Sequence, residues 1–199
     1  MERTAPLGVA LIEVGHQAPA TDSPDSTPER ATARHCPMAD RPEVPQFGAL
    51  LREHIQSVPP EAQPAFLSGL ERSAAQRYRD WALALPDWAD VLGDCARRED
   101  EIADVISRRF PVSSEHQAQI DAILPAAVAL YYDVFEPYSP EDQVYLQSEA
   151  EIQGSQAWVR LADAGITDPD TLADLARCTE LELESSRAVK RLLGDQVAA

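Results

Sequence analysis

The sequence predicts an all-α protein built from two similar helical hairpins. The pattern of residues 70–82 (LERSAAQRYRDWA) recurs 80 positions later in residues 150–162 (AEIQGSQAWVRLA). Aligning the two stretches pairs Glu71 with Glu151, Ala74 with Gly154, Gln76 with Gln156, Tyr78 with Trp158, and Ala82 with Ala162. Strand-like runs of Val, Ile and Thr are nearly absent, and only 8 residues are glycine. Self-similarity at a fixed period indicates a repeated architecture.

The first 45 residues are predicted to form a disordered segment, and residues 46–199 to form one helical domain. The segment contains 7 of the 16 prolines and a tract rich in Ser, Thr, Pro and Asp over residues 18–32. It has too little apolar surface to offset the entropy lost on ordering. Met38 would serve as an alternative start of translation.

The first half of the domain is predicted to hold a short helix and two long ones, over residues 47–58, 61–85 and 86–109. Apolar residues recur at helical spacing in each, and prolines separate them because proline ends a helix or opens the next. The short helix is expected to lie across the bundle. The apolar stripes of the two long helices include Glu71 and Glu99.

A crossover helix over residues 115–135, with Pro125 kinking it or lying near its start, is expected to lead to the second hairpin. That hairpin is predicted over residues 140–164 and 168–193. Each of its helices begins with a capping residue followed by proline. Its glutamates are Glu151 and Glu180, and an alternative stripe in the last helix would bury Glu182 instead of Glu180.

Charge and cysteine content exclude several classes of function. The formal net charge is -17, about -15 of it beyond residue 42, which argues against nucleic acid or an anionic membrane as a partner. The longest apolar run, residues 122–132, is shorter than the ~20 residues of a membrane span. Three cysteines without metal-ligand spacing favour a reducing, cytoplasmic location. The simplest explanation of the negative net charge is a solvated acidic surface. The alternative explanation is that the acidic residues attract metal cations.

The helical stripes place carboxylates where the hydrophobic core is expected. A buried carboxylate is costly unless a metal, a cationic side chain, a shared proton or water compensates for its lost hydration. Four-helix bundles with one carboxylate on each helix, two of them followed by His three residues later, hold paired metal ions between the helices.

Residue identities around the glutamates resemble the rubrerythrin type of ferritin-like protein. Glu71 is followed by Arg77-Tyr78 and then by Trp81-Ala82, which is similar to the family's first bundle helix. Residues 88–99 are similar to its second. The resemblance covers residues 61–193 and implies a ferritin-like four-helix bundle of two hairpins joined by a helical crossover. It also implies an Fe or Mn site whose ligands are Glu71, Glu99, Glu151 and Glu180.

The sequence departs from the family pattern at both expected histidines. The residues three positions after Glu99 and Glu180 are Ile102 and Leu183. A site made of carboxylates alone would bind metal more weakly and favour harder cations. Neighbouring acids that could substitute as ligands are Glu101, Glu149, Glu182 and Glu184.

Two classes of function follow. The resemblance implies iron oxidation, iron handling, or reduction of peroxide or O₂. The alternative is a non-catalytic interaction module that has lost its metal and binds a protein partner, with homodimerisation as one form. Its core glutamates would then be hydrogen-bonded to Gln76, Gln156, Tyr78 or Arg77. Phosphate-binding loops, nucleophile elbows and His-based zinc motifs are absent from the sequence.

Overall fold

The computed structural model describes residues 41–194, and all regular elements within them are helices. The prediction of an all-α fold is therefore confirmed, while the predicted disorder falls almost entirely outside the described residues. The elements are α1 (Phe47–Leu50), α2 (Arg52–Gln56), η2 (Pro60–Ala62), α3 (Gln63–Ala84), η3 (Pro86–Trp88), α4 (Ala89–Arg109), α5 (Ser114–Phe135), α6 (Pro140–Asp163) and α7 (Pro169–Leu192).

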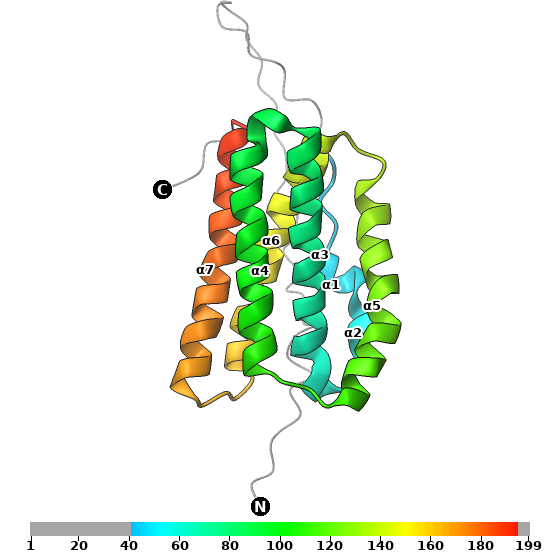
Figure 1. Cartoon of the computed structure of the whole chain (residues 1–199), viewed down its shortest axis with the longest axis vertical. Helices are drawn as coiled ribbons and strands as arrows, with labels where there is room; N and C mark the ends of the chain where they lie inside the picture. Colours follow the sequence, from blue (N-terminus) through cyan, green and yellow to red (C-terminus); the bar gives the residue numbers. More distant parts are fainter. Residues whose placement is uncertain (1–40, 195–199) are drawn as a thin grey trace, which may run out of the picture.

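The long helices form two hairpins that lie side by side (Figure 1). Helix α3 packs along α4, α6 packs along α7, and α4 contacts α7 between the hairpins. Helices α3 and α6 touch each other much less, so a seam is left between them. The segment that contains α1 and α2 lies at this seam, where the Phe47 amide donates to Gln153 Oε1 of α6 at 2.9 Å.

Helix α5 runs along the outside of α3 and returns the chain to the second hairpin (Figure 1). The two helices approach closely at Gly69, where an added Cβ would lie 2.6 Å from Leu124 Cδ2. Pro125 lies in the middle of α5 rather than near its start. Among the described helices, only α5 is long and apolar enough, by length and composition, to cross a membrane. Here it packs against the other helices through Ile120, Ala127 and Phe135.

The interior has two hydrophobic clusters, and all four bundle helices contribute to both. The first contains Phe66, Leu70, Ile102, Trp158 and Leu181, and the second contains Tyr78, Leu92, Val144, Ala150 and Val189. Along each helix, the residues of one cluster are followed by those of the other, with a glutamate at the changeover. The sequence therefore builds a polar layer between two apolar ones.

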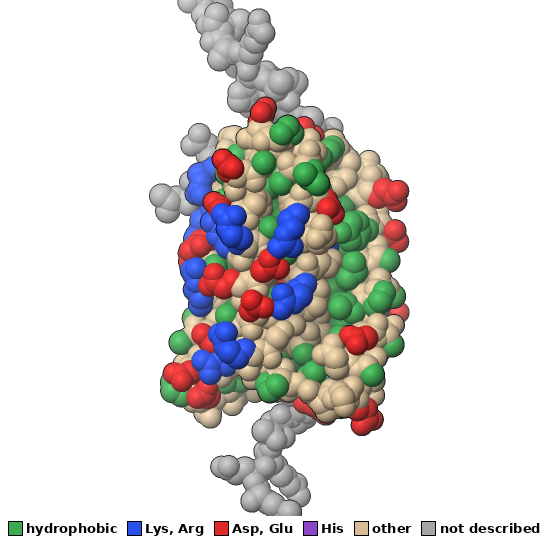
Figure 2. All heavy atoms as spheres, viewed as in Figure 1, with side chains coloured by type: hydrophobic (Ala, Val, Ile, Leu, Met, Phe, Trp, Pro, Cys, Tyr) green, Lys and Arg blue, Asp and Glu red, His purple; other side chains and the backbone are tan. Residues whose placement is uncertain are grey.

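Ion pairs cover the surface above α3, α4 and α7, where blue and red side chains alternate in Figure 2. Arg72 pairs with Asp104 at 2.6 Å across α3 and α4, and Arg177 pairs with Glu101 at 3.3 Å across α7 and α4. Single exposed pairs contribute about 1 kcal/mol or less. Their role here is to offset part of the acidic charge on this face.

Candidate metal centre

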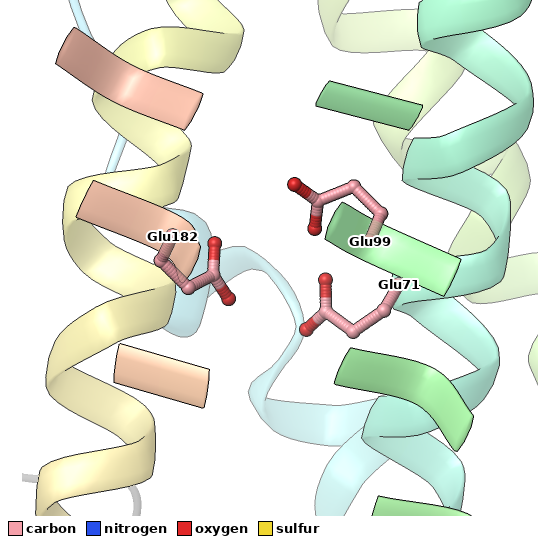
Figure 3. A group of neighbouring side chains, drawn as sticks. All are labelled: Glu71, Glu99 and Glu182. Atoms are coloured by element: carbon pink, nitrogen blue, oxygen red, sulfur yellow. The ribbon is translucent and has the colours of Figure 1, made fainter. Parts of the chain in front are cut away.

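Three carboxylates from three helices meet in the polar layer (Figure 3). Glu71 comes from α3, Glu99 from α4 and Glu182 from α7. One oxygen of each lies within 4.8 Å of the others. Two oxygens on opposite sides of one divalent cation are separated by roughly 4.0–5.0 Å, since each bond is about 2.0–2.5 Å long. The three groups are thus close to the spacing that a single ion requires.

Glu151 of α6 is the fourth carboxylate of the layer and is only 2% exposed. The Tyr78 hydroxyl donates to its Oε1 at 2.7 Å, and Gln147 Nε2 donates to the same oxygen at 2.7 Å. Burial, the charge of Glu71 and the neighbouring Glu151 raise the pKa of Glu182. Glu151 therefore lies near Glu71 and Glu99 and raises the pKa of both, but it is not one of the three carboxylates whose oxygens lie within 4.8 Å of one another.

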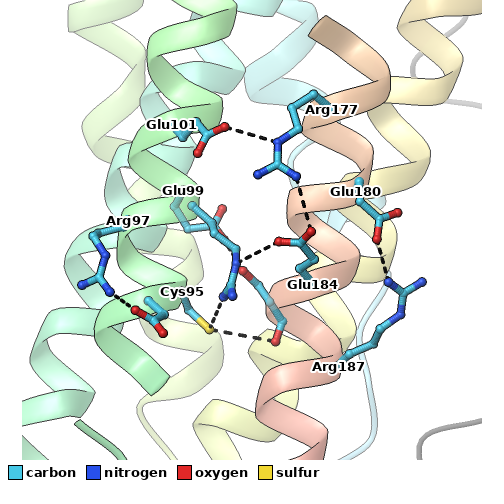
Figure 4. Close-up of polar contacts among 11 residues, drawn as sticks. Cys95, Arg97, Glu99, Glu101, Arg177, Glu180, Glu184 and Arg187 are labelled. Atoms are coloured by element: carbon cyan, nitrogen blue, oxygen red, sulfur yellow. Dashed lines mark hydrogen bonds and ion pairs between the residues drawn. The ribbon is translucent and has the colours of Figure 1, made fainter. Parts of the chain in front are cut away.

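The fourth predicted residue, Glu180, is not part of the cluster. It is exposed on α7 and pairs with Arg187 at 2.8 Å (Figure 4). Glu182 takes the interior position and is 1% exposed. A shift of two residues turns the side chain by about 200° around a helix of 3.6 residues per turn. The alternative register of the last helix is the one that the structure adopts.

Specific contacts hold the clustered carboxylates. Trp158 Nε1 donates to Glu182 Oε1 at 2.8 Å. Ser185 Oγ donates to Glu99 Oε1 at 3.2 Å. Ser185 lies three residues after Glu182, so it takes the position assigned to Leu183 in the sequence alignment. Glu99 is completely buried, and its Oε2 has no hydrogen-bond partner among the described residues. A buried acceptor without a partner is rare and costly.

Burial and mutual repulsion raise the pKa values of the cluster. Burial, followed by the charge of Glu151, raises the pKa of Glu71 from 4.5 to about 8, against a lowering effect of Arg77. Burial, Glu151 and Glu71 raise the pKa of Glu99 well above its ordinary value. Burial and Glu71 do the same to the pKa of Glu182. Without a metal, the cluster therefore retains protons at neutral pH.

Arg77 supplies one positive charge near these acids and is 4% exposed. Its Nη2 donates to Gln147 Oε1 at 3.1 Å, and its guanidinium carbon lies 4.9 Å from the centroid of the Tyr131 ring. Of the partners predicted for the core glutamates, Tyr78 binds Glu151 as expected, whereas Arg77 donates to Ser73 and Gln147 and to no glutamate. Gln76, also named, instead binds Asp80. Gln147 was not predicted, although a glutamine four residues before Glu151 on one helical face was a usable signal.

A pocket of about 720 Å³ connects this layer with the seam between α3 and α6. Glu71, Glu151 and Glu182 line its inner end. Glu71 keeps part of its surface accessible, whereas the other three carboxylates are buried. A cation or a small molecule could therefore reach the carboxylates from this side.

The donor set suits a hard divalent cation. All four acidic groups offer oxygen, and carboxylate oxygens are preferred by Mn²⁺, Mg²⁺ and Ca²⁺. Cys95 lies one helical turn before Glu99, but burial raises the pKa of its thiol to about 12, so it stays protonated. The partnerless Glu99 Oε2 is an oxygen that a cation would satisfy. The residues fit a metal ion on these grounds.

Comparisons with known proteins found no relative of this chain. No protein-family model matches the chain, no curated protein matches it, and no solved structure matches it.

Proposed function

We propose that the carboxylate layer binds a divalent cation, Mn(II) or Fe(II), between the two hairpins. The observation that carries the proposal is the convergence of Glu71, Glu99 and Glu182, with oxygens within 4.8 Å, in a buried layer. Buried acids at this spacing are costly unless protons or a cation neutralise them. Arg77 provides one positive charge near four acids, so cation binding would remove most of the remaining repulsion.

We also propose, from the resemblance to ferritin-like proteins, what a cation bound at this site would do. Two hairpins joined by a crossing helix, with one glutamate per bundle helix, support a ferritin-like arrangement. Iron or manganese bound there would supply redox chemistry in which Fe(II) gives up electrons and O₂ or peroxide accepts them. The chain's own contributions are oriented oxygen ligands, with Tyr78 and Gln147 holding Glu151, and the release of protons from Glu71, Glu99 and Glu182 as a cation binds.

Metal titration tests the proposal. The full-length protein is stripped with a chelator and titrated with Mn(II), and anaerobically with Fe(II), by calorimetry. We expect near-stoichiometric binding in the wild type, loss of binding in Glu71→Ala, and no change in Glu180→Ala. The proposal would be contradicted if the wild-type protein binds neither metal, or if Glu71→Ala binds metal as tightly as the wild type.

The outer face of α5 favours a second candidate function, self-association as an interaction module. Small or apolar exposed residues recur at helical spacing on that face, namely Ala118, Ala122, Ala126, Ala129 and Tyr132, and the exposed acids Glu115 and Asp133 lie on the same face. Figure 2 shows apolar side chains on the side of the molecule where α5 lies in Figure 1. Sedimentation velocity of wild type and Ala126→Glu tests it, because a dimer formed by this face should dissociate in the variant.

A further inference from the structure

The pocket between α3 and α6 has an apolar wall that metal binding does not use. Phe47, Leu51, Ile55, Leu67 and Leu70 line it, with the α1–α2 segment on one side. In Figure 3 this segment passes behind the space between α6 and α3. The volume of the pocket lies within the roughly 300–1,000 Å³ of small-molecule sites, and its lining combines this apolar wall with polar and charged side chains.

One cationic side chain lining this pocket has no hydrogen-bond or ion-pair partner in the described part of the chain. Arg160 of α6 has no acidic group within ion-pair distance among the described residues, and its buried Nε has no hydrogen-bond partner. Glu149 on the same lining pairs with Lys190 at 2.6 Å. Arg77 has no ion pair among the described residues and its Nε also lacks a partner, but its other nitrogens donate to Ser73 and Gln147. Desolvation also lowers the pKa of Arg160. In a protein of net charge -17, an arginine left unpaired inside a pocket is an available anion site.

We propose that this pocket binds an amphiphilic monocarboxylate whose carboxylate pairs with Arg160 and whose apolar body lies toward Leu67 and Leu70. A guanidinium binds a carboxylate through two parallel hydrogen bonds. A single negative charge suits the site, because the carboxylate layer at the inner end would repel a second one. Arg160 lies about 13.5 Å from Glu151 along the axis of α6 and half a turn around it, so a medium-length acyl chain such as decanoate would extend along the pocket from Arg160 toward the carboxylate layer.

This proposal goes beyond the metal site and does not require it to be occupied. The head group is held by α6 near the outer end, nine positions along the chain from Glu151, while the cluster lies at the inner end. Binding can therefore be measured in the chelator-treated protein, and failure of metal binding would not by itself remove ligand binding.

The test is calorimetric titration of the metal-free, full-length protein with decanoate and with decylamine. We expect saturable binding of decanoate and weaker or no binding of decylamine. Arg160→Gln should weaken decanoate binding about tenfold or more, since a hydrogen-bonded charge contributes roughly 1.5–3 kcal/mol. Arg160→Lys should retain part of the affinity. Arg187→Gln, a surface arginine paired with Glu180, should leave the affinity unchanged.

A brominated decanoate locates the ligand by quenching tryptophan fluorescence. Trp158 lines the pocket, whereas Trp81 and Trp88 do not. Quenching should therefore be lost in Trp158→Phe. The proposal is overturned if decanoate shows no saturable binding, if Arg160→Gln binds it as tightly as wild type, if decylamine binds more tightly, or if quenching persists in Trp158→Phe.

Discussion

The carboxylate of Glu182 lies directly against the backbone of Gly154. A Cβ added at Gly154 would be 2.7 Å from Glu182 Oε1 and 3.0 Å from its Cδ. Gly154 occupies the position that Ala74 holds in the first repeat. The second hairpin therefore has no methyl group at the point where the Glu182 carboxylate packs. Glycine inside a helix is destabilising by roughly 0.5–1 kcal/mol relative to alanine. The close approach to Glu182 is a specific reason for tolerating that cost.

Gly154→Ala should separate stability from metal binding. The new methyl group would push the flexible Glu182 side chain away from α6 and out of its hydrogen bond with Trp158. We expect a melting temperature close to that of the wild type, because the gain in helix propensity is offset by the loss of the buried hydrogen bond, together with Mn(II) affinity reduced about tenfold. Calorimetry and thermal melts measure the two effects.

Gly93→Ala is the matched control for this substitution. Gly93 also lies inside a helix, α4, and its added Cβ would meet only Arg97 Nη1 at 3.7 Å. This variant should gain stability without losing metal affinity. Equal metal affinity in Gly154→Ala and wild type would show that the position of Glu182 does not matter for the cation.

Glu99→Gln should stabilise the metal-free protein and weaken metal binding. The glutamine amide keeps an oxygen that can accept the hydrogen bond from Ser185. The substitution removes the Glu99 carboxyl group, whose pKa is raised by burial and by its acidic neighbours. We expect an unfolding free energy higher than that of the wild type by about 1 kcal/mol or more at pH 8, and Mn(II) affinity lower by more than tenfold. Denaturant unfolding and calorimetry measure these. Unchanged affinity would exclude Glu99 as a ligand.

Helix boundaries could be predicted because local signals define them. Ser139 and Asp168 cap α6 and α7 as expected, with their side chains accepting from the amides of Asp142 and Thr171. Such caps depend on a few neighbouring residues. The two hairpins and the crossover therefore followed from the sequence, within a few residues at each end.

The register of the last helix could not be predicted from the repeat alone. The spacing from Glu71 to Glu99 is 28 residues, but the spacing from Glu151 to the buried Glu182 is 31. The repeat alignment kept the spacing nearly constant and so selected Glu180. The three extra residues amount to almost one helical turn. Glu182 therefore still faces the interior of the bundle, although it lies farther along the chain than the repeat predicts. Only the apolar stripe of the helix itself carried that information.

The stability of the metal-free protein should fall as the pH rises from about 5 to 8. Glu71 in the native state keeps its proton up to about pH 8, whereas an ordinary glutamate loses it near pH 4.5. The native state then binds more protons than the unfolded state, so this contribution is fully present below pH 4.5 and is lost by pH 8. Burial shifts the pKa of Glu99 and Glu182 in the same direction.

Thermal melts of chelator-treated protein between pH 5 and 8 measure this dependence. The slope is at most ~1.4 kcal/mol per pH unit for each proton. Glu71→Gln should flatten it, and Glu180→Gln, which alters a surface acid, should not. Saturating Mn(II) should raise the melting temperature most at pH 8, where fewer protons compete for the oxygens. A melting temperature independent of pH in the wild type would contradict the raised pKa values.

Restoring histidines should strengthen the site only in the register that the structure shows. Ser185 and Ile102 lie three residues after Glu182 and Glu99, on the same helical faces. Ser185 Oγ already contacts Glu99, so an imidazole at that position would reach the cluster. Leu183 is offset from Glu182 by about 100° and is only half-buried.

The comparison is between Ile102→His/Ser185→His and Ile102→His/Leu183→His. Both carry the same core substitution at Ile102, so the loss of packing there is shared. Anaerobic titration with Fe(II) and titration with Zn(II), which imidazole binds well, should show affinity at least tenfold above wild type in the first variant and no gain from Leu183→His in the second. Equal affinities in the two variants would mean that residue 185 does not face the cation. That result would also contradict the assignment of Glu182 as a ligand of the cation.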